Sequence, residues 1–406
     1  MVYIGMSLYP EYATWAEMRD AALLVDQLGY DGLFTSDHFI PSTTAGHLTG
    51  PNLEGWQILA AWGAITRRSQ IGTLVTGNTY RHPAILAKMA ATLDHITGGR
   101  AVLGLGAGWF EAEHRMYGLD FGTLGQRMGR LAESAEIVRS LLDRPRTTFH
   151  GRHYELTDAL AEPKPVQARL PLLIGGAGER KTLRVVAQYA DMWHRDGPPD
   201  LIAHRIEVLK RHCDAVGRDL AEILPIAGGA VVVRDDAEGV NARLREWTAR
   251  GRVVGQPILP STAGTPDQVA AHLAAQWRAG ARGWIFYMQP PYDRETIERL
   301  QRDVRPRLME MIGGEDVPWR PRSALARSGD VGEGGREMRE TSDEVAKVRA
   351  ALRLVLDGVY CGCERGGRQI VSVNLCLVHG WRARDAWALL AEGDEGERGS
   401  GDPAPV

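Results

Sequence analysis

Cysteine is scarce in this sequence, and long apolar runs are missing. Of the four cysteines only Cys213 lies ahead of residue 320, so no disulfide framework holds the main body together. No apolar run reaches the roughly 18 to 20 residues that span a bilayer, and the first residues lack the basic and apolar segments of a secretory leader. We therefore expect a cytoplasmic protein that does not associate with a membrane.

An excess of positive charge is also missing. The formal net charge is −3, with 24% charged and 44% hydrophobic residues, which is an ordinary globular composition. Nucleic acids and anionic membranes attract proteins that carry a basic field or stripe, so neither is an expected partner. Small neutral or anionic ligands remain open.

Metal-binding patterns are absent from the main body, where no H-x-x-x-H or H-E-x-x-H spacing occurs. The tail contains Cys361, Cys363, Cys376 and His379, which are ligand types that zinc accepts. Their C-x-C spacing departs from the usual C-x-x-C knuckle, so free thiols are the preferred interpretation. We predict no metal site.

Short apolar strands alternate with amphipathic helices up to about residue 312, a pattern typical of a parallel sheet covered by helices. In the first helix Thr14 and Glu17 have the spacing of a capping box, and Gly29 ends it. A doubly wound open sheet uses similar units, but no G-x-G-x-x-G turn follows the first strand. The pattern predicts an α/β fold, a TIM (β/α)8 barrel with insertions, whose strand candidates are 2–8, 31–36, 70–76, 101–106, 170–175, 189–194, 223–233 and 282–288.

Two insertions and a C-terminal extension of uncertain structure accompany the predicted barrel. Residues 144–170 are predicted to form a hairpin or a long loop, and a second excursion covers about 235–264. Thr341 and Glu344 match a second capping box in the extension. The predicted organisation is a barrel domain at 1–314, a flexible linker at 315–340, a short helical tail at 341–391 and a disordered C-terminus at 392–406.

Asp37 and His38 stand where the second predicted strand ends. In a parallel α/β barrel the functional residues lie at that end of the strands. An imidazole titrates near neutral pH, so His38 can accept or donate a proton there, and a neighbouring carboxylate can set its tautomer or its charge. Side chains adjacent in a strand point to opposite faces, so a purely structural Asp-His turn is the alternative.

Two glycine-rich turns follow the fourth and fifth predicted strands. Glycines at 175–178 allow backbone N–H groups to approach a phosphate at a helix N-terminus, where Arg180 or Lys181 would add positive charge. The turn at 104–108 precedes Trp109, which indicates close approach of the backbone to a flat ring, or an aromatic wall beside one. Glycines placed for steric reasons and a Trp109 buried in the core are the alternatives.

The third predicted strand brings Thr76 and Asn78 to the same end, and the loop after it carries Arg81 and His82. Arg81 is a candidate contact for an anionic group, and His82 is a candidate for exposure to solvent. The alternative is that either residue caps the helix that begins at Pro83.

The chain resembles the luciferase-like flavin and deazaflavin oxidoreductases, and within them the F420-dependent branch. The resemblance covers about residues 2 to 312. It rests on Thr35-Ser36-Asp37-His38-Phe39, on Gly72 to Gly77 with Tyr80-Arg81-His82-Pro83, on Leu86 to Asp94 with Gly98-Gly99-Arg100, on Leu103 to His114, and on Ile174 to Thr182.

This resemblance implies a barrel whose C-terminal end binds a flavin-like ring, with the ring edge near the catalytic candidates Asp37 and His38. His38 is then the candidate proton-transfer group, the phosphate lies at Gly175 and Gly176, and a non-prolyl cis peptide is expected at Leu74–Val75. The implied cofactor-binding residues are Leu74, Val75, Thr76, Gly106, Ala107, Trp109, Gly175, Gly176, Ala177 and Gly178, and the substrate contacts expected are Glu54, Arg81, His82 and His194.

One residue departs from the relatives that oxidise sugar phosphates, which carry an acidic residue just after the glycine-rich turn where this chain has Trp109. That substrate class is therefore not favoured. The leading prediction is an oxidoreductase that transfers a hydride between coenzyme F420 and a small organic substrate. A monooxygenase that uses reduced FMN and molecular oxygen is the alternative, and a non-catalytic barrel subunit is less favoured. The family also suggests a homodimer, with a reductase that supplies reduced cofactor as a candidate partner.

Overall fold

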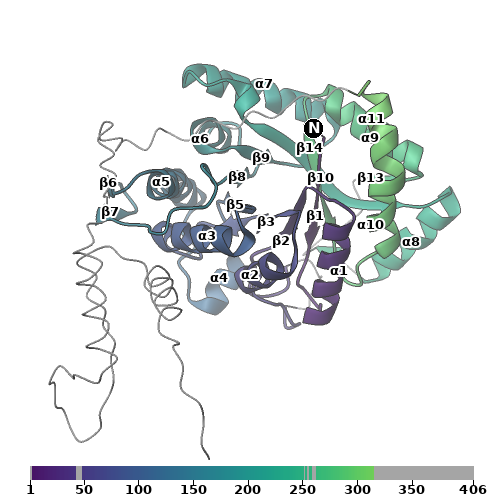
Figure 1. Cartoon of the computed structure of the whole chain (residues 1–406), viewed down its shortest axis with the longest axis horizontal. Helices are drawn as coiled ribbons and strands as arrows, with labels where there is room; N and C mark the ends of the chain where they lie inside the picture. Colours follow the sequence, from purple (N-terminus) through teal and green to yellow (C-terminus); the bar gives the residue numbers. More distant parts are fainter. Residues whose placement is uncertain (1, 43–47, 251, 254–255, 258–261, 315–406) are drawn as a thin grey trace, which may run out of the picture. The chain divides into compact units, whose positions relative to one another are not determined.

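The computed structural model describes residues 2–42, 48–250, 252–253, 256–257 and 262–314. The predictions for 315–340, 341–391 and 392–406 lie outside these residues. In the described part, eight parallel strands close into a barrel, which Figure 1 shows at the centre with helices around it. The prediction of a TIM barrel is therefore confirmed.

The barrel strands are the predicted ones, with their ends shifted by a few residues. They follow one another around the ring in the order of the chain, and pairing of β10 with both β9 and β14 completes the closure. The short β4 follows β3 after a break and pairs with β5. The bounds are β1 Tyr3–Leu8, β2 Gly32–Thr35, β3 Gln70–Thr73, β4 Thr76–Gly77, β5 Ala101–Gly106, β8 Leu172–Gly175, β9 Met192–His194, β10 Leu224–Val233 and β14 Gly283–Met288.

Alternate side chains of these strands pack into two separate layers. Phe34 and Leu173 belong to a buried cluster of strand residues alone, so they fill the interior of the barrel. Their neighbours Leu33 and Ile174 belong to the larger cluster that includes the helices. Because both faces of each strand are packed, the barrel is a fixed support for the side chains at the strand ends.

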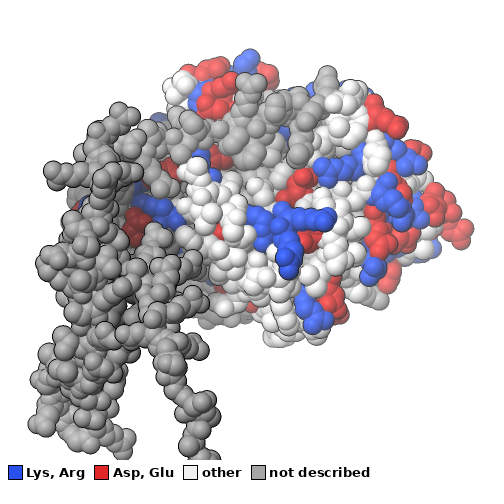
Figure 2. All heavy atoms as spheres, viewed as in Figure 1, with Lys and Arg blue, Asp and Glu red and all other residues white. Residues whose placement is uncertain are grey.

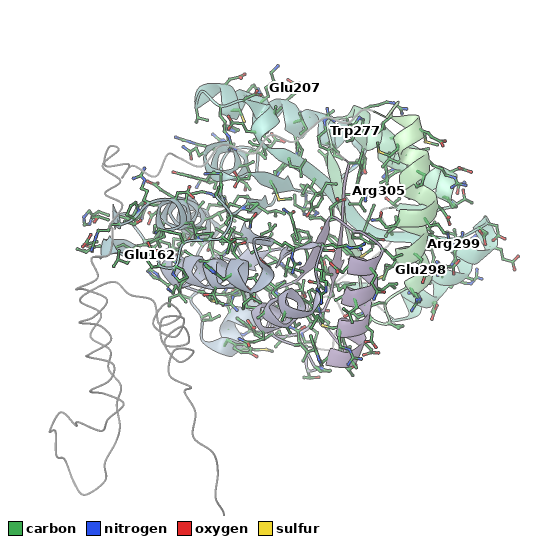
Figure 3. All side chains as sticks on the ribbon, viewed as in Figure 1. Glu162, Glu207, Trp277, Glu298, Arg299 and Arg305 are labelled. Carbon is green, nitrogen blue, oxygen red and sulfur yellow. The ribbon has the colours of Figure 1, made fainter. Side chains whose placement is uncertain are left out.

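Helices cover the outside of the barrel (Figure 1). Thr14 and Glu17 form the predicted capping box of α1, and Gly29, with φ of 75°, follows its end. Trp277 of α9, labelled in Figure 3, stacks on Trp284 of β14 with ring centroids 6.4 Å apart. No described helix combines the length and the apolar character needed to cross a bilayer. The helices are α1 Trp15–Gln27, α2 Gly55–Ile65, α3 Pro83–Thr97, α4 Glu111–Tyr117, α5 Leu124–Asp143, α6 Thr182–Tyr189, α7 Pro199–Ala215, α8 Ala237–Arg250, α9 Pro266–Arg278, α10 Arg294–Arg299 and α11 Arg305–Met311, with a 3₁₀ turn at Leu220–Glu222 and a π turn at Leu300–Val304.

Both predicted insertions contain secondary structure. Residues 144–170 include two antiparallel strands, which confirms the hairpin prediction. The second excursion leaves the C-terminal end of β10 and returns to it, because its last strand pairs in parallel with β10. The added elements are β6 Thr147–His150 and β7 Glu155–Ala159 in the hairpin, and α8, β11 Arg252–Val253, β12 Gln256–Pro257 and β13 Thr262–Gly264 in the excursion.

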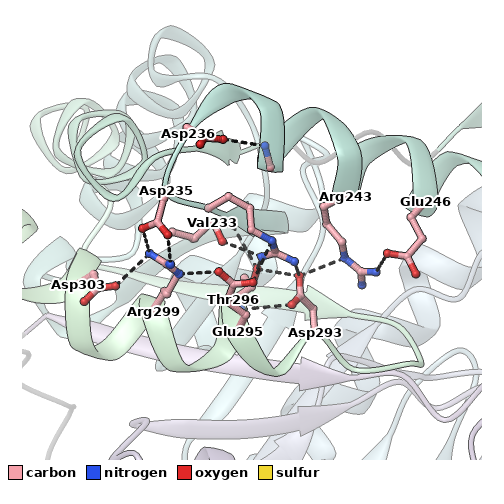
Figure 4. A network of polar contacts seen from close by, with 12 residues as sticks. Val233, Asp235, Asp236, Arg243, Glu246, Asp293, Glu295, Thr296, Arg299 and Asp303 are labelled. Atoms are coloured by element: carbon pink, nitrogen blue, oxygen red, sulfur yellow. Dashed lines mark hydrogen bonds and ion pairs between the residues drawn. The ribbon is translucent and has the colours of Figure 1, made fainter.

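Charged side chains fasten the second excursion to the barrel (Figure 4). Arg234, just after β10, and Arg243 of α8 both contact Asp293 Oδ2, at 2.9 and 3.1 Å. Thr296 Oγ1 donates to the same oxygen at 2.8 Å. Burial raises the pKa of Asp293, but the two arginines and Thr296 outweigh burial and lower it. Asp293 therefore remains charged and holds α8 against the start of α10.

The same network continues to the surface through Arg299. Its guanidinium contacts both carboxylate oxygens of Asp235, each at 2.7 Å. On the right of Figure 2, where α8 and α10 lie, acidic and basic side chains are intermixed. Neither sign of charge dominates that face, in agreement with the small net charge.

Asp293→Asn is expected to lower the free energy of unfolding by about 1.5 to 3 kcal/mol at neutral pH, because two arginines lose a charged acceptor. The difference from the unaltered protein should shrink in acid. A lowered folded-state pKa contributes stability above the unfolded value, about 3.9, and that stability is lost as the pH falls through the folded-state pKa. Urea unfolding at neutral and acid pH measures both effects.

Asp235→Asn is the control, because it removes the exposed carboxylate that pairs with Arg299 in the same network. This change is expected to alter the free energy of unfolding little. Equal losses from the two substitutions would contradict the role given to the buried carboxylate.

Candidate active site

Asp37 follows β2, and its carboxylate is bound by Arg81. The guanidinium contacts both oxygens, with Nη1 2.6 Å from Oδ2 and Nη2 3.2 Å from Oδ1. Thr76 Oγ1 donates to Oδ2 as well. Asp37 is 1% exposed, so the carboxylate side of this bidentate pair is removed from water. The carboxylate of Asp37 is therefore engaged by Arg81 and Thr76 and makes no contact with the imidazole of His38.

Arg81 is shared between two carboxylates of the chain. Its Nη2 also donates to Glu54 Oε1 at 2.7 Å, and Glu54 Oε2 accepts from the N–H of Gln57 at the start of α2. Burial lowers the pKa of Arg81, but Asp37 and Glu54 outweigh burial and raise it. Arg81 and Glu54, two predicted substrate contacts, thus pair with each other, and Arg81 also pairs with Asp37. The three side chains together keep one net negative charge, so Arg81 is not left unpaired for an anionic substrate.

His38 contacts Glu113, a residue to which the sequence pattern assigned no role. Nδ1 of His38 lies 3.1 Å from Oε2 of Glu113, in α4, and 3.3 Å from the hydroxyl of Tyr80. The Tyr80 hydroxyl donates to Glu113 Oε2, and the N–H of Phe39 donates to Glu113 Oε1. The partner of His38 is therefore an acid that lies 75 residues away in the chain.

Glu113 is completely buried, yet it is held in the charged form. Burial raises the pKa of Glu113, but the hydrogen bonds from His38, Tyr80 and Phe39 outweigh burial and lower it. Burial and the neighbouring Glu113 both raise the pKa of Tyr80, so the phenol keeps its proton. The cluster therefore consists of a carboxylate that accepts from Tyr80 and Phe39 and lies against the imidazole of His38.

Aromatic rings flank the imidazole of His38 edge-on. The ring centroids of Tyr80, Trp109 and Phe110 lie 6.4, 5.6 and 5.8 Å from that of His38. Trp109 stacks on Phe110 with centroids 5.1 Å apart, while Ala107, two residues earlier, packs against the core. Because Trp109 is 57% exposed, the alternative that it lies in the core is wrong. An exposed indole thus stands next to His38.

Val75 lies in the break between β3 and β4, and its peptide bond with Leu74 is cis, which confirms that prediction. Both side chains are half-buried and pack against the interior cluster of the barrel. A Cβ atom added at Gly106 would lie 2.7 Å from Val75 Cγ2, and one at Gly175 would lie 3.0 Å from the same atom. Glycines on β5 and β8 therefore make room for Val75 at the C-terminal end of the barrel.

The turn between β8 and α6 has backbone N–H groups without protein partners. Gly176 has φ of 125°, which favours glycine, and its N–H donates to the carbonyl of His194 at 3.2 Å. Within the described part of the chain, the N–H groups from Ala177 to Thr182 donate to no other residue, and Lys181 at the N-cap makes no capping bond. N–H groups at the start of a helix attract anions, so the turn, which contains Gly178, suits a phosphate.

Glu179, the one acidic residue in this turn, is engaged by α7. Its Oε1 lies 3.0 Å from Nε2 of His204, and its carbonyl oxygen lies 2.7 Å from Nε2 of His212. The side chain of Glu179 is thus held by a neighbouring helix, whereas Arg180 and Lys181 are exposed beside it. The charge balance of the turn favours an anion.

His194 and His82 make no contact with His38 in the described structure. His194 ends β9, with Nε2 3.5 Å from both Asp196 Oδ1 and the Tyr287 hydroxyl. Burial lowers the pKa of His194, against the opposing effect of Asp196. His82 is exposed, and its Nδ1 accepts from the N–H of Ala84 at 3.2 Å, so it caps α3 as the alternative predicted.

Several buried polar atoms at the C-terminal end of the barrel have no hydrogen-bond partner in the described part of the chain. They are Ser36 Oγ after β2, Asn52 Oδ1 in the loop that leads to α2, Asn78 Oδ1 after β4 and Gln289 Nε2 after β14. Buried polar groups are normally hydrogen-bonded. Each of these atoms is left to a partner outside the described chain, such as a water molecule or a ligand.

Comparison with known proteins places this geometry in a family. A family model described as luciferase-like monooxygenase matches residues 4–303. The chain belongs to the luciferase-like monooxygenase family. Among its luciferase-like relatives, the F420-dependent glucose-6-phosphate dehydrogenase of Microbacterium testaceum is 30% identical over 322 residues, which cover 72% of this chain and 93% of the relative.

Solved structures of two further proteins share the luciferase-like fold. The coenzyme F420-dependent tetrahydromethanopterin reductase of Methanopyrus kandleri has a TM-score of 0.63 at 20% identity, covering 76% of this chain and 99% of its own. The oxygenating constituent of 3,6-diketocamphane monooxygenase from Pseudomonas putida, in complex with FMN, has a TM-score of 0.59 at 17% identity, covering 76% and 99%. At these identities the likeness establishes the fold alone.

Asp37→Asn is expected to lower the free energy of unfolding by about 1.5 to 3 kcal/mol, because the fully buried bidentate acceptor of Arg81 loses its charge. Glu54→Gln removes the other carboxylate on the same guanidinium, whose side chain is 37% exposed, and is expected to cost less than about 1 kcal/mol. Denaturant unfolding of the two variants measures the contrast. Similar losses in both would show that the buried pair is not the dominant contact of Arg81.

Proposed function

We propose that this luciferase-like protein is an F420-dependent oxidoreductase that transfers a hydride between coenzyme F420 and a small organic substrate. The observation that carries the proposal is the imidazole of His38, which Glu113 holds at the C-terminal end of the barrel. The relative from Microbacterium testaceum is named as an F420-dependent enzyme, which supports this choice of cofactor. Its sugar-phosphate substrate is not carried over, because the exposed residue beside His38 is Trp109 and Arg81 is already paired.

The residues at this end of the barrel fit such a cofactor. Leu74 and Val75 provide a half-buried apolar surface for a flat ring, and the N–H groups of 177–182 provide donors for a phosphate. The unpartnered amide atoms of Asn78 and Gln289 suit the polar edge of a ring or a hydroxylated chain. When bound, F420 would supply the deazaflavin ring that gives or takes the hydride.

The chain itself contributes proton handling and orientation. His38 can take the proton that a hydroxyl-bearing substrate loses as its carbon gives up a hydride, or return it in the opposite direction. Asp37, Arg81 and Thr76 do not touch His38, so their role is to hold the end of β2 against β4 and the start of α3. Trp109 presents an apolar surface beside the imidazole and excludes water from part of it.

A monooxygenase that uses reduced FMN and molecular oxygen is the second candidate, because the fold is shared with an FMN-containing monooxygenase. FMN also has a flat ring and a phosphate, so Val75 and the turn at 177–182 suit both cofactors. The two cofactors differ in the oligoglutamyl tail that F420 carries. Direct binding therefore distinguishes the candidates.

Titration of the purified protein with F420 and, separately, with FMN tests the proposal by fluorescence. We expect saturable F420 binding and much weaker FMN binding. Ala177→Asp places a carboxylate among the unpartnered N–H groups and is expected to weaken F420 binding at least about tenfold, equivalent to about 1.4 kcal/mol. Ala177→Asn is the matched control, because asparagine has nearly the same size as aspartate but carries no charge.

Tight FMN binding without F420 binding would overturn the leading proposal in favour of the monooxygenase. Equal losses of affinity in Ala177→Asp and Ala177→Asn would show that the turn does not hold an anion. Absence of binding for both cofactors would favour the non-catalytic barrel subunit.

A further inference from the structure

The imidazole of His38 has two ring nitrogens, and the described residues engage one of them. Nδ1 contacts Glu113 Oε2 and the Tyr80 hydroxyl, at 3.1 and 3.3 Å. Nε2 has no hydrogen-bond partner in the described part of the chain. The side chain of His38 is 12% exposed, whereas that of Glu113 is fully buried. The protein thus holds the imidazole from its Nδ1 side.

The number of protons in this cluster determines which atom donates to which. Tyr80 has a single hydroxyl proton, and it is directed at Glu113 Oε2. The carboxylate of Glu113 accepts from the Tyr80 hydroxyl on Oε2 and from the Phe39 N–H on Oε1, two donors that do not depend on the imidazole, so the geometry favours its ionised form, which accepts only. Both oxygens near Nδ1 are then acceptors toward the imidazole. An unprotonated Nδ1 would direct its lone pair at lone pairs of Glu113 Oε2 and the Tyr80 hydroxyl oxygen, which is repulsive. A proton on Nδ1 removes this repulsion, so we infer that Nδ1 is the protonated nitrogen.

We propose that Glu113 is a positioning residue that keeps the neutral imidazole of His38 in the Nδ1–H tautomer and leaves the Nε2 lone pair toward the reacting partner. Nε2 is then the atom that accepts a proton. The imidazolium formed by that step keeps its Nδ1–H directed at the carboxylate, 3.1 Å away, which stabilises the new positive charge. This role deepens the proposed function and rests on it for its catalytic meaning, but the tautomer itself does not depend on any cofactor.

Other charged or titratable groups near the imidazole are already engaged elsewhere. Asp37 and Arg81 pair with each other, so neither competes for His38. His114 of α4 stacks on Tyr80, and its two ring nitrogens contact the Thr79 hydroxyl at 2.7 Å and the Phe110 carbonyl at 2.8 Å. Tyr80 keeps its proton because burial and Glu113 raise its pKa. Glu113 is therefore the ionised group in direct contact with the imidazole.

The tautomer can be measured by 15N NMR on the full-length protein without any cofactor, because a protonated and an unprotonated ring nitrogen differ widely in chemical shift. His38→Gln assigns the signals. At a pH where the imidazole is neutral, we expect the Nδ1–H form of His38 in the unaltered protein. In Glu113→Gln the amide can donate as well as accept, so the population should shift at least about tenfold toward Nε2–H. An Nε2–H tautomer in the unaltered protein would overturn the inference outright.

Glu111→Gln is the matched control, since Glu111 lies in the same first turn of α4, is exposed, and does not contact His38. It should leave the His38 tautomer unchanged. Tyr80→Phe provides a second test that leaves the carboxylate in place, and the Nδ1–H form should persist. A switch of tautomer in Tyr80→Phe would assign the role to Tyr80 instead of Glu113.

The outcomes separate this inference from the proposed function. Failure of F420 to bind the unaltered protein would contradict the proposed function without affecting the tautomer. Glu113→Gln should bind F420 within about twofold of the unaltered protein, because the residue acts through His38. A loss of F420 affinity of about tenfold or more in that variant would show that Glu113 serves the cofactor directly and would contradict the positioning role.

Discussion

Closure of the sheet through the pairing of β9 with β10 and of β14 with β1 is the constraint on which the functional site depends. Because all eight strands run parallel in a closed ring, their C-terminal ends meet at one rim. Residues far apart in the chain, such as His38 after β2 and Gly176 after β8, therefore belong to one end of the molecule. Because the interior is closely packed, the strands have little freedom to move. The barrel therefore fixes the relative positions of the residues at the strand ends.

The fold could be predicted from the sequence because the patterns that mark its strands and helices lie within short segments of the chain. Each strand is a short apolar run that ends at a turn, and helix starts such as Thr14 with Glu17 carry their own capping pattern. The cis bond at Leu74–Val75 came from resemblance to the family and is confirmed. The tail from residue 315 lies outside the described residues, so its predicted organisation stays a prediction.

The site was only partly readable, because its contacts are long-range. Asp37 and His38 are adjacent in the sequence, yet strand geometry sends their side chains to different partners. No spacing rule links His38 to Glu113 across 75 residues, although the two acidic residues in the first turn of α4 were visible. His82 proved to be a helix cap, which the proline after it had already indicated. The local sequence pattern thus predicted which residues lie at the strand ends, but it did not predict their hydrogen-bond partners.

The residues around His38 and the turn at 177–182 come from different parts of the chain. Asp37, His38, Arg81 and Glu113 all precede the end of α5, whereas the N–H groups of 177–182 and His194 follow the hairpin β6–β7. In the proposed function, proton transfer therefore belongs to residues of the half-barrel before the hairpin, and phosphate binding belongs to residues of the half-barrel after it. A recombination point within the β6–β7 hairpin, away from the strand ends that carry the site, would exchange one half while preserving every contact inside the other.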